Sequence, residues 1–272
     1  GVITRFTTKS KIFDSHKYVK IQNLSIADIL MLVVDSYYND VKINARKSLT
    51  PDAINRELLA LKDLWKYKNH NQYILDEDNI RDIQEYMIEV IGVGASNVNN
   101  SDFFDTIADN IQYIPIDKWV NVFELLWNKN ENFCKIFKAL LNEYAKIDFR
   151  TEICVPYETI LREHGTLMQI QWLDLVCGKG VTGEIDLPVL TTNVYDLQGN
   201  LLVADYPKTY LSAFAAEIEL VLPAAMQVNR PFLAEVDLLD FPGARNRLDK
   251  IEDDIDYTSD MPEMLRRGKV AY

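Results

Sequence analysis

The pattern of apolar residues along the chain changes from a helical period to a strand period near residue 178. From about residue 25 to residue 177, apolar side chains recur every third or fourth position, which is typical of amphipathic helices. The clearest stripe runs from Phe133 to Tyr144. After residue 177, short alternating stretches separated by turn residues are typical of strands. The sequence therefore predicts a helical segment followed by a segment of mixed strand and helix.

The predicted helices begin at residues that are common at helix N-termini. These starts are at Ser25, Thr50, Asp76, Ser101 and Pro115. Thr50 places a hydroxyl directly before Pro51, and proline suits the first helical position. Asp28 stands three positions after Ser25, as in a capping box.

Strand signals lie at both ends of the chain. Residues 192–196 and 201–205 flank a glycine-containing loop, a pattern that predicts a β-hairpin. Residues 233–239 alternate between apolar and acidic side chains, which favours an antiparallel strand with one solvated face. Residues 213–222 fit either a helix or a strand. At the other end, we assign residues 1–24 to a strand segment.

The balance of charge narrows the range of partners. The 272 residues include 29 Lys and Arg against 41 Asp and Glu, a formal net charge of −12. Such an acidic surface disfavours binding to nucleic acid or to an anionic membrane. No apolar run of the sequence approaches the ~20 residues that a membrane-spanning helix requires. We therefore expect no nucleic-acid partner and no membrane partner for this chain.

The cysteines suggest a reducing environment. Cys134, Cys154 and Cys177 contain no C-x-x-C pair, and an odd number does not suit a disulfide framework. The histidines are too far apart in sequence to indicate a metal-ligand cluster. We expect a cytoplasmic protein, with a secreted effector as the alternative.

One short motif near the C-terminus points to a specific chemistry. Residues 238–243, Leu-Leu-Asp-Phe-Pro-Gly, are an apolar strand that runs into D-x-P-G. In P-loop GTPases a D-x-x-G at the end of a strand serves the terminal phosphate of the nucleotide. Its carboxylate reaches the Mg²⁺ shell, and its glycine brings a backbone N–H close to the γ-phosphate. The alternative is a strand followed by a proline-glycine turn, in which Asp240 caps its own backbone.

The first residues of the chain add a second signal. Val2-Ile3-Thr4-Arg5 resembles the switch I segment of dynamin-like proteins, in which a threonine meets Mg²⁺ and the γ-phosphate. Taken alone, the segment is an ordinary strand start. The order of the two motifs along the chain is the one that the resemblance requires. This interpretation predicts that Thr4 and Asp240 lie on neighbouring strands with converging side chains.

The C-terminal stretch resembles a known family. Residues 235–245 and 265–272 are similar to the bacterial virulence factor family of the SrfC-like type. The resemblance covers residues 1–8 and 185–272, and members of that family look like large dynamin-type GTPases. It implies an α/β fold, in which a partial P-loop GTPase-like core carries a large all-α helical insertion. The core would comprise 1–24 and 178–272, and the insertion would comprise 25–177.

The resemblance also implies roles for individual residues. Thr4 would bind Mg²⁺ and phosphate, and Asp240 would be the carboxylate of the Mg²⁺ shell. Gly243 would donate its backbone N–H to the γ-phosphate, while Arg5 and Arg245 would neutralise phosphate charge. The implied catalytic residues are Thr4, Asp240 and Gly243, and the implied ligands of the intact protein are GTP and Mg²⁺.

Other GTPase motifs are missing from the sequence. No G-x-x-x-x-G-K-[ST] occurs, and we interpret the glycine-rich residues 178–183 as a turn. No N-K-x-D base-reading sequence follows a strand. The chain thus looks like the middle of a GTPase, cut after its phosphate loop and before its next core strand. Without the lysine and backbone amides of that loop, it should not hydrolyse GTP alone.

A role can also be predicted for the helical segment, residues 25–177. Helices inserted near a nucleotide site commonly report the state of that site, so we expect a lever or an oligomerisation surface. It would act through self-association or through a protein partner. The competing interpretation of the whole chain is a non-enzymatic α+β interaction module in which D-x-P-G is a structural turn.

Overall fold

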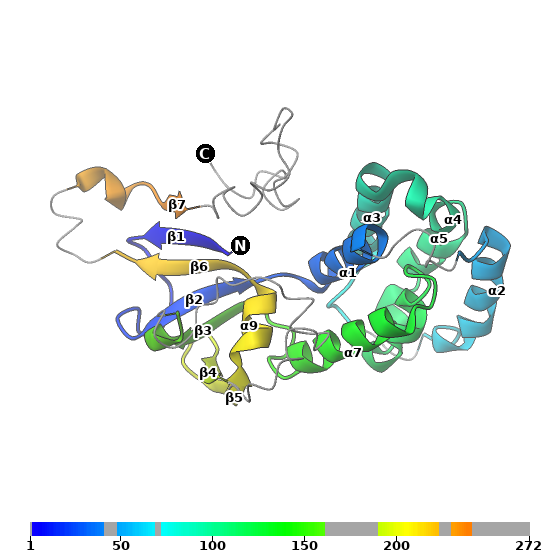
Figure 1. Cartoon of the computed structure of the whole chain (residues 1–272). Helices are drawn as coiled ribbons and strands as arrows, with labels where there is room; N and C mark the ends of the chain where they lie inside the picture. The colour runs from blue at the N-terminus through cyan, green and yellow to red at the C-terminus, as the bar shows by residue number, and fades with distance from the viewer. Residues whose placement is uncertain (1, 41–47, 69–71, 161–189, 223–229, 241–272) are drawn as a thin grey trace, which may run out of the picture. The chain divides into compact units, whose positions relative to one another are not determined.

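A mixed seven-stranded sheet organises the fold. The computed structural model describes residues 2–40, 48–68, 72–160, 190–222 and 230–240. The strands are β1 (Ile3–Thr7), β2 (Tyr18–Asn23), β3 (Glu152–Pro156), β4 (Thr191–Tyr195), β5 (Leu201–Pro207), β6 (Ala215–Val221) and β7 (Leu238–Asp240). Their order across the sheet is β5-β4-β3-β2-β6-β1-β7 (Figure 1). β1 runs parallel to β6, and the other neighbouring pairs are antiparallel.

Helices make up every described element between β2 and β3. The α-helices there are α1 (Ile26–Asp40), α2 (Pro51–Leu61), α3 (Glu77–Tyr86), α4 (Ser96–Asn99), α5 (Phe103–Ala108), α6 (Trp119–Phe123) and α7 (Glu131–Ala145). Shorter turns join them, namely η2 (Lys62–Leu64), η3 (Met87–Ile91), η4 (Gly92–Ala95), η5 (Ile111–Tyr113) and η6 (Ile116–Lys118). Later in the chain come η7 (Tyr157–Ile160), α9 (Lys208–Phe214) and η10 (Pro231–Ala234). None of the helices in the described ranges combines the length and hydropathy that crossing a membrane requires.

Three of the predicted helix starts are confirmed by their capping bonds, and Asp76 forms a complete capping box ahead of α3. The backbone N–H of Ala53 donates to Thr50 Oγ1 at 3.3 Å, and Pro51 is the first residue of α2. Ahead of α1, the backbone N–H of Ser25 donates to Asp28 Oδ2 at 2.8 Å, and that of Asp28 donates to Ser25 Oγ at 3.1 Å. These side chains satisfy backbone donors that the first helical turn leaves without a partner.

The structure also decides between alternatives for the strands. The predicted hairpin is confirmed, because β4 and β5 pair in antiparallel around Gly199, whose φ of 91° favours glycine. The ambiguous residues 213–222 form the end of α9 and then β6. The predicted strand over 233–239 is wrong for most of its length: Pro231 starts the turn η10, and only Leu238–Asp240 form a strand.

One strand lies inside the range predicted to be helical. β3 lies between β2 and β4 and has three consecutive buried residues, Ile153, Cys154 and Val155, so side chains on both of its faces are buried. The domain limits 1–24, 25–177 and 178–272 stay predictions. Segments predicted within 161–189 and 241–272, including the glycine-rich turn at 178–183, lie outside the described residues.

The central strands give the sheet one apolar face and one charged face. On β2, Ile21 alternates with Lys20, and on β6, Ile218 alternates with Glu217 and Glu219. Ile21 pairs in register with Ile218, and Lys20 pairs with Glu219. Side chains of opposed residues share a face, so the apolar residues gather on one side and the charged residues on the other.

Tyr144 on α7 ties the helices to the sheet. Its hydroxyl lies 2.7 Å from the carbonyl oxygen of Leu24 and 3.2 Å from that of Arg150, the residues that flank the helical stretch. Its ring centroid is 4.7 Å from that of Phe214 on α9. Burial raises the pKa of the Tyr144 hydroxyl, which therefore stays protonated as a donor. Buried apolar side chains of the helices and of the central strands form one contiguous cluster around it.

Removal of the Tyr144 hydroxyl should weaken this junction. Tyr144→Phe keeps the ring but takes the donor away from two backbone carbonyl groups, so we expect the free energy of unfolding to fall by about 1–2 kcal/mol. Urea denaturation measures the change. Tyr157→Phe, at a position that is 44% exposed, is the control and should change stability by less than about 0.5 kcal/mol. Equal effects of the two substitutions would contradict the role given to Tyr144.

Candidate functional site

β1 and β7 place Thr4 opposite Asp240. The two strands pair in antiparallel, and the register partners are Thr4 with Asp240, Arg5 with Leu239, and Phe6 with Leu238. Side chains of directly opposed residues project to the same face of a sheet. Two candidate residues from opposite ends of the chain are therefore neighbours, as the interpretation of the sequence requires.

The pair combines a buried hydroxyl on the apolar face of the sheet with an exposed carboxylate at its edge. Thr4 is 8% exposed and has Ile218 of β6 on its other side, whereas Asp240 is exposed at the edge of the sheet. A hydroxyl and a carboxylate are oxygen ligands of the kind that Mg²⁺ accepts. Gly243 and Arg245, the other residues that the resemblance implies, lie outside the described residues.

The pair would not hold a metal ion alone. Among the residues that the structure describes, no three His, Cys, Asp or Glu side chains are grouped so that they could ligate one ion. Mg²⁺ commonly binds through one or two protein oxygens and takes its remaining ligands from phosphates and water. A Mg²⁺ at this pair would therefore need further ligands, such as phosphate oxygens or water, beyond Thr4 and Asp240.

Arg5 projects to the opposite face and contacts two carboxylates. Its Nε donates to Glu217 Oε1 at 2.6 Å and its Nη2 to Glu217 Oε2 at 3.1 Å, a bidentate contact. Its Nη1 donates to Asp237 Oδ2 at 3.1 Å. The hydrogen bond to Glu217 is the main reason that the pKa of Arg5 is raised. Arg5 thus joins β6 to the segment before β7, and a phosphate would have to displace one of these carboxylates to reach it.

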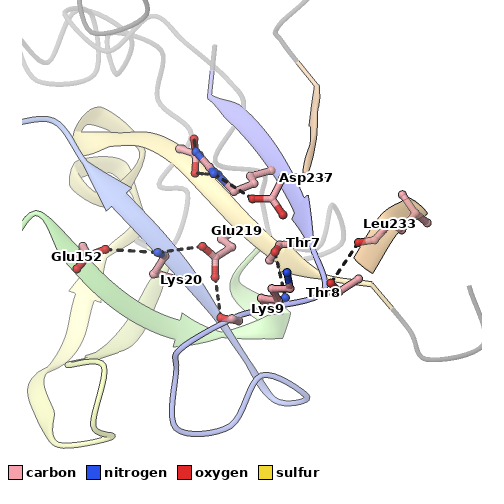
Figure 2. Close-up of polar contacts among 11 residues, drawn as sticks. Thr7, Thr8, Lys9, Lys20, Glu152, Glu219, Leu233 and Asp237 are labelled. Atoms are coloured by element: carbon pink, nitrogen blue, oxygen red, sulfur yellow. Dashed lines mark hydrogen bonds and ion pairs between the residues drawn. The ribbon is translucent and has the colours of Figure 1, made fainter. Parts of the chain in front are cut away.

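Lys20 continues the charged face across β2. Its Nζ lies 2.9 Å from Glu219 Oε2 and 3.4 Å from Glu152 Oε1, and Figure 2 shows the lysine between the two carboxylates. The hydroxyl of Ser10 donates to Glu219 Oε1 at 2.7 Å. Burial disfavours the charge of Lys20, but the bonds to Glu219 and then Glu152 outweigh it, so the pKa of Lys20 is raised.

Three other residues of the charged face were not among the sequence-based candidates. These are Glu217, Glu219 and Lys20. Each alternates with apolar residues along its strand, and this period of two is the sequence signal that could have identified them as members of a charged face. It predicts one charged face for each strand. It does not say which strands are neighbours, so the ion pairs themselves could not be predicted.

A hollow of about 230 Å³ lies near the other end of the sheet. It is lined by Pro156, Glu158, Thr159, Leu190, Thr191, Thr192 and Lys208. Lys208 Nζ donates to the carbonyl oxygen of Thr159 at 3.0 Å, and burial lowers the pKa of Lys208. None of the residues implied by the D-x-P-G or Thr-Arg motifs lines this hollow, so it is separate from the pair on β1 and β7.

Comparison with known proteins identifies the family. A family model described as a putative bacterial virulence factor matches residues 1–272. The chain belongs to this family. No curated protein and no solved structure matches it. The virulence factor family model spans the helical segment as well as the two ends on which the resemblance was based. Its description names no reaction, so the chemistry has to be argued from the residues.

Glu219 should contribute more to stability than Glu152, although both contact Lys20. The side chain of Glu219 is 9% exposed and that of Glu152 is 45% exposed, so water screens the second pair far more than the first. We expect Glu219→Gln to lower the free energy of unfolding by about 1–3 kcal/mol, and Glu152→Gln by less than about 1 kcal/mol. Chemical denaturation of the two variants tests this, and equal losses would contradict the assignment.

Cys154, which is opposite Lys20 in register, should resist thiol reagents in the folded protein. It is 0% exposed, and burial raises the pKa of its thiol to about 12. An unfolded thiol ionises near pH ~8.5, whereas the buried thiol stays protonated until a higher pH. The free energy of unfolding is therefore unaffected by this group below pH ~8.5, and it falls as the pH rises from there toward the pKa of the folded state. We expect Cys154→Ala to lose less stability than the parent between about pH 8 and about pH 10. Parallel pH dependences would contradict this.

Proposed function

We propose that the chain supplies the magnesium-facing part of a GTP-binding core, in a protein that hydrolyses GTP to drive a conformational change or assembly. The observation that carries the proposal is the register pairing of Thr4 with Asp240 across β1 and β7. The apolar strand before Asp240 and the D-x-P-G after it support the same assignment. So does the family resemblance, which implies a dynamin-like GTPase.

The two residues would have different tasks. The Thr4 hydroxyl would be an oxygen ligand of Mg²⁺, and the Asp240 carboxylate would accept hydrogen bonds from water in the Mg²⁺ shell. When bound, Mg²⁺ neutralises charge on the β- and γ-phosphates during transfer. Gly243 would turn a backbone N–H toward the γ-phosphate, because a glycine allows the backbone to approach closely.

The helices between β2 and β3 would transmit the state of this site. Their junction with the sheet at Tyr144 joins α7 to the backbone at both ends of the helical stretch, at Leu24 and Arg150. A shift of the sheet would therefore act on α7 directly. We propose that the helices use this connection to contact a second copy or a protein partner.

A specific observation favours the alternative of a non-enzymatic interaction module. Phe232, Val236 and Leu238 are 52%, 46% and 44% exposed beside the edge strand β7. An exposed apolar edge is the surface that binds an extended peptide by strand addition. In that case D-x-P-G would only end the strand, and no nucleotide would be needed.

Nucleotide binding by the protein encoded by the complete gene tests the proposal. We expect a fluorescent GTP analogue to bind in a Mg²⁺-dependent manner, and Asp240→Asn to weaken that binding by at least about tenfold. Asp205→Asn is the matched control. Asp205 is exposed on the edge strand β5, at the opposite end of the sheet order, and asparagine tolerates its φ of 53°. Absence of binding, or equal effects of the two variants, would overturn the proposal.

A further inference from the structure

We infer that Arg5 is a positioning residue, whose ion pair with Asp237 sets the register of β7 on β1 and thereby holds Asp240 opposite Thr4. The part that concerns Mg²⁺ rests on the proposed function. The part that concerns the strand rests on geometry alone.

β7 needs an anchor because its own pairing is small. It has three residues, lies at the edge of the sheet and, among the described strands, pairs with β1. Leu238 and Asp240 are exposed, so Leu239 is the one residue of the strand that is even partly buried. Each backbone hydrogen bond contributes only about 0.5–1.5 kcal/mol net, which leaves so short a strand weakly held.

Arg5 is well placed to be that anchor. Its bidentate contact with Glu217 ties the guanidinium to β6, and the Glu217 side chain is only 11% exposed. A planar guanidinium held at two nitrogens directs its remaining N–H groups in a fixed direction. The third contact, from Nη1 to Asp237 at 3.1 Å, reaches the residue immediately before β7. The position of Asp237 is thus fixed relative to β6 and β1 together.

A second side-chain contact of this segment lies further from β7 in sequence. The hydroxyl of Thr8 donates to the carbonyl oxygen of Leu233 at 3.2 Å, which holds η10 near the end of β1 (Figure 2). That bond is neutral, whereas the contact at Asp237 is charge-assisted and lies closer to Asp240 in sequence. The Asp237 side chain is 38% exposed, so water partly screens this pair, and its influence on where β7 starts comes from its place directly before the strand.

A change of register would separate Thr4 from Asp240. A slip of one residue turns every side chain of a strand to the opposite face, so Asp240 would leave the face of Thr4. A slip of two residues would keep the face but move Asp240 by about 7 Å along β1. An Asp237 held by Arg5 disfavours both slips.

Disulfide trapping in the 272-residue chain tests the strand part. Phe6 and Leu238 are register partners, so Phe6→Cys with Leu238→Cys should cross-link readily under mild oxidation. The pair Phe6→Cys with Asp240→Cys is out of register by two residues and should cross-link slowly. Asp237→Asn should lower the ratio of the first rate to the second by at least about threefold. An unchanged ratio overturns the inference.

The matched control is a charge-conserving substitution at the same position. Asp237→Glu keeps the charge and should restore most of the ratio that Asp237→Asn loses. A ratio that stays low in Asp237→Glu would show that a carboxylate at this position is not what sets the register. We expect the ratio of the in-register to the out-of-register cross-linking rate to fall in Asp237→Asn and to stay close to that of the parent in Asp237→Glu.

The Mg²⁺ part is tested with the protein encoded by the complete gene. We expect Asp237→Asn to raise the Mg²⁺ concentration needed for half-maximal binding of the GTP analogue by at least about threefold, with Asp237→Glu close to the parent. An unchanged Mg²⁺ requirement overturns the claim that the ion pair positions Asp240. If the parent binds no nucleotide, the proposed function fails, while the cross-linking ratio still decides the role of Arg5 in strand register.

Discussion

Burial of Ile21 and Ile218 at the centre of the sheet is the constraint on which the other contacts depend. The two residues are opposed in register on β2 and β6, and they are 0% and 4% exposed. A slip of one position would bring Lys20 and Glu219 into the apolar interior, which would be far more costly than the loss of a few contacts. This register then fixes β6, and the parallel pairing of β6 with β1 fixes the strand that carries Thr4 and Arg5.

The charged face follows from the same alternation. Arg5 and Lys20 lie next to Glu217 and Glu219, and these partly buried ions have partners of opposite sign. Such pairs add less to stability than their number suggests, since each ion first loses water. Their effect here is on geometry: they connect β1, β2 and β6, and through Asp237 they also reach the segment before the edge strand.

Membership in the virulence factor family leaves the chemistry to be argued from a small set of residues. Thr4 and Asp240 come together although a long helical stretch separates them in sequence, and that juxtaposition is the reason for preferring a magnesium–phosphate site over a simple turn. The exposed apolar side chains beside β7 are the reason for keeping an interaction module as the alternative. Both interpretations concern the same edge of the sheet, where the family model also extends.

The sequence by itself determined the local features. The caps at Thr50 and Ser25, the buried stripe of α7 and the β4–β5 hairpin depend on residues within a few positions of one another, and the physics of capping and periodicity acts at that range. Only the tertiary structure decided that residues 213–222 end in a strand, that β6 is the other neighbour of β1, and that Arg5 contacts Glu217, 212 positions away. Strand neighbours are chosen by how whole faces are buried together, and no short window of sequence contains that information.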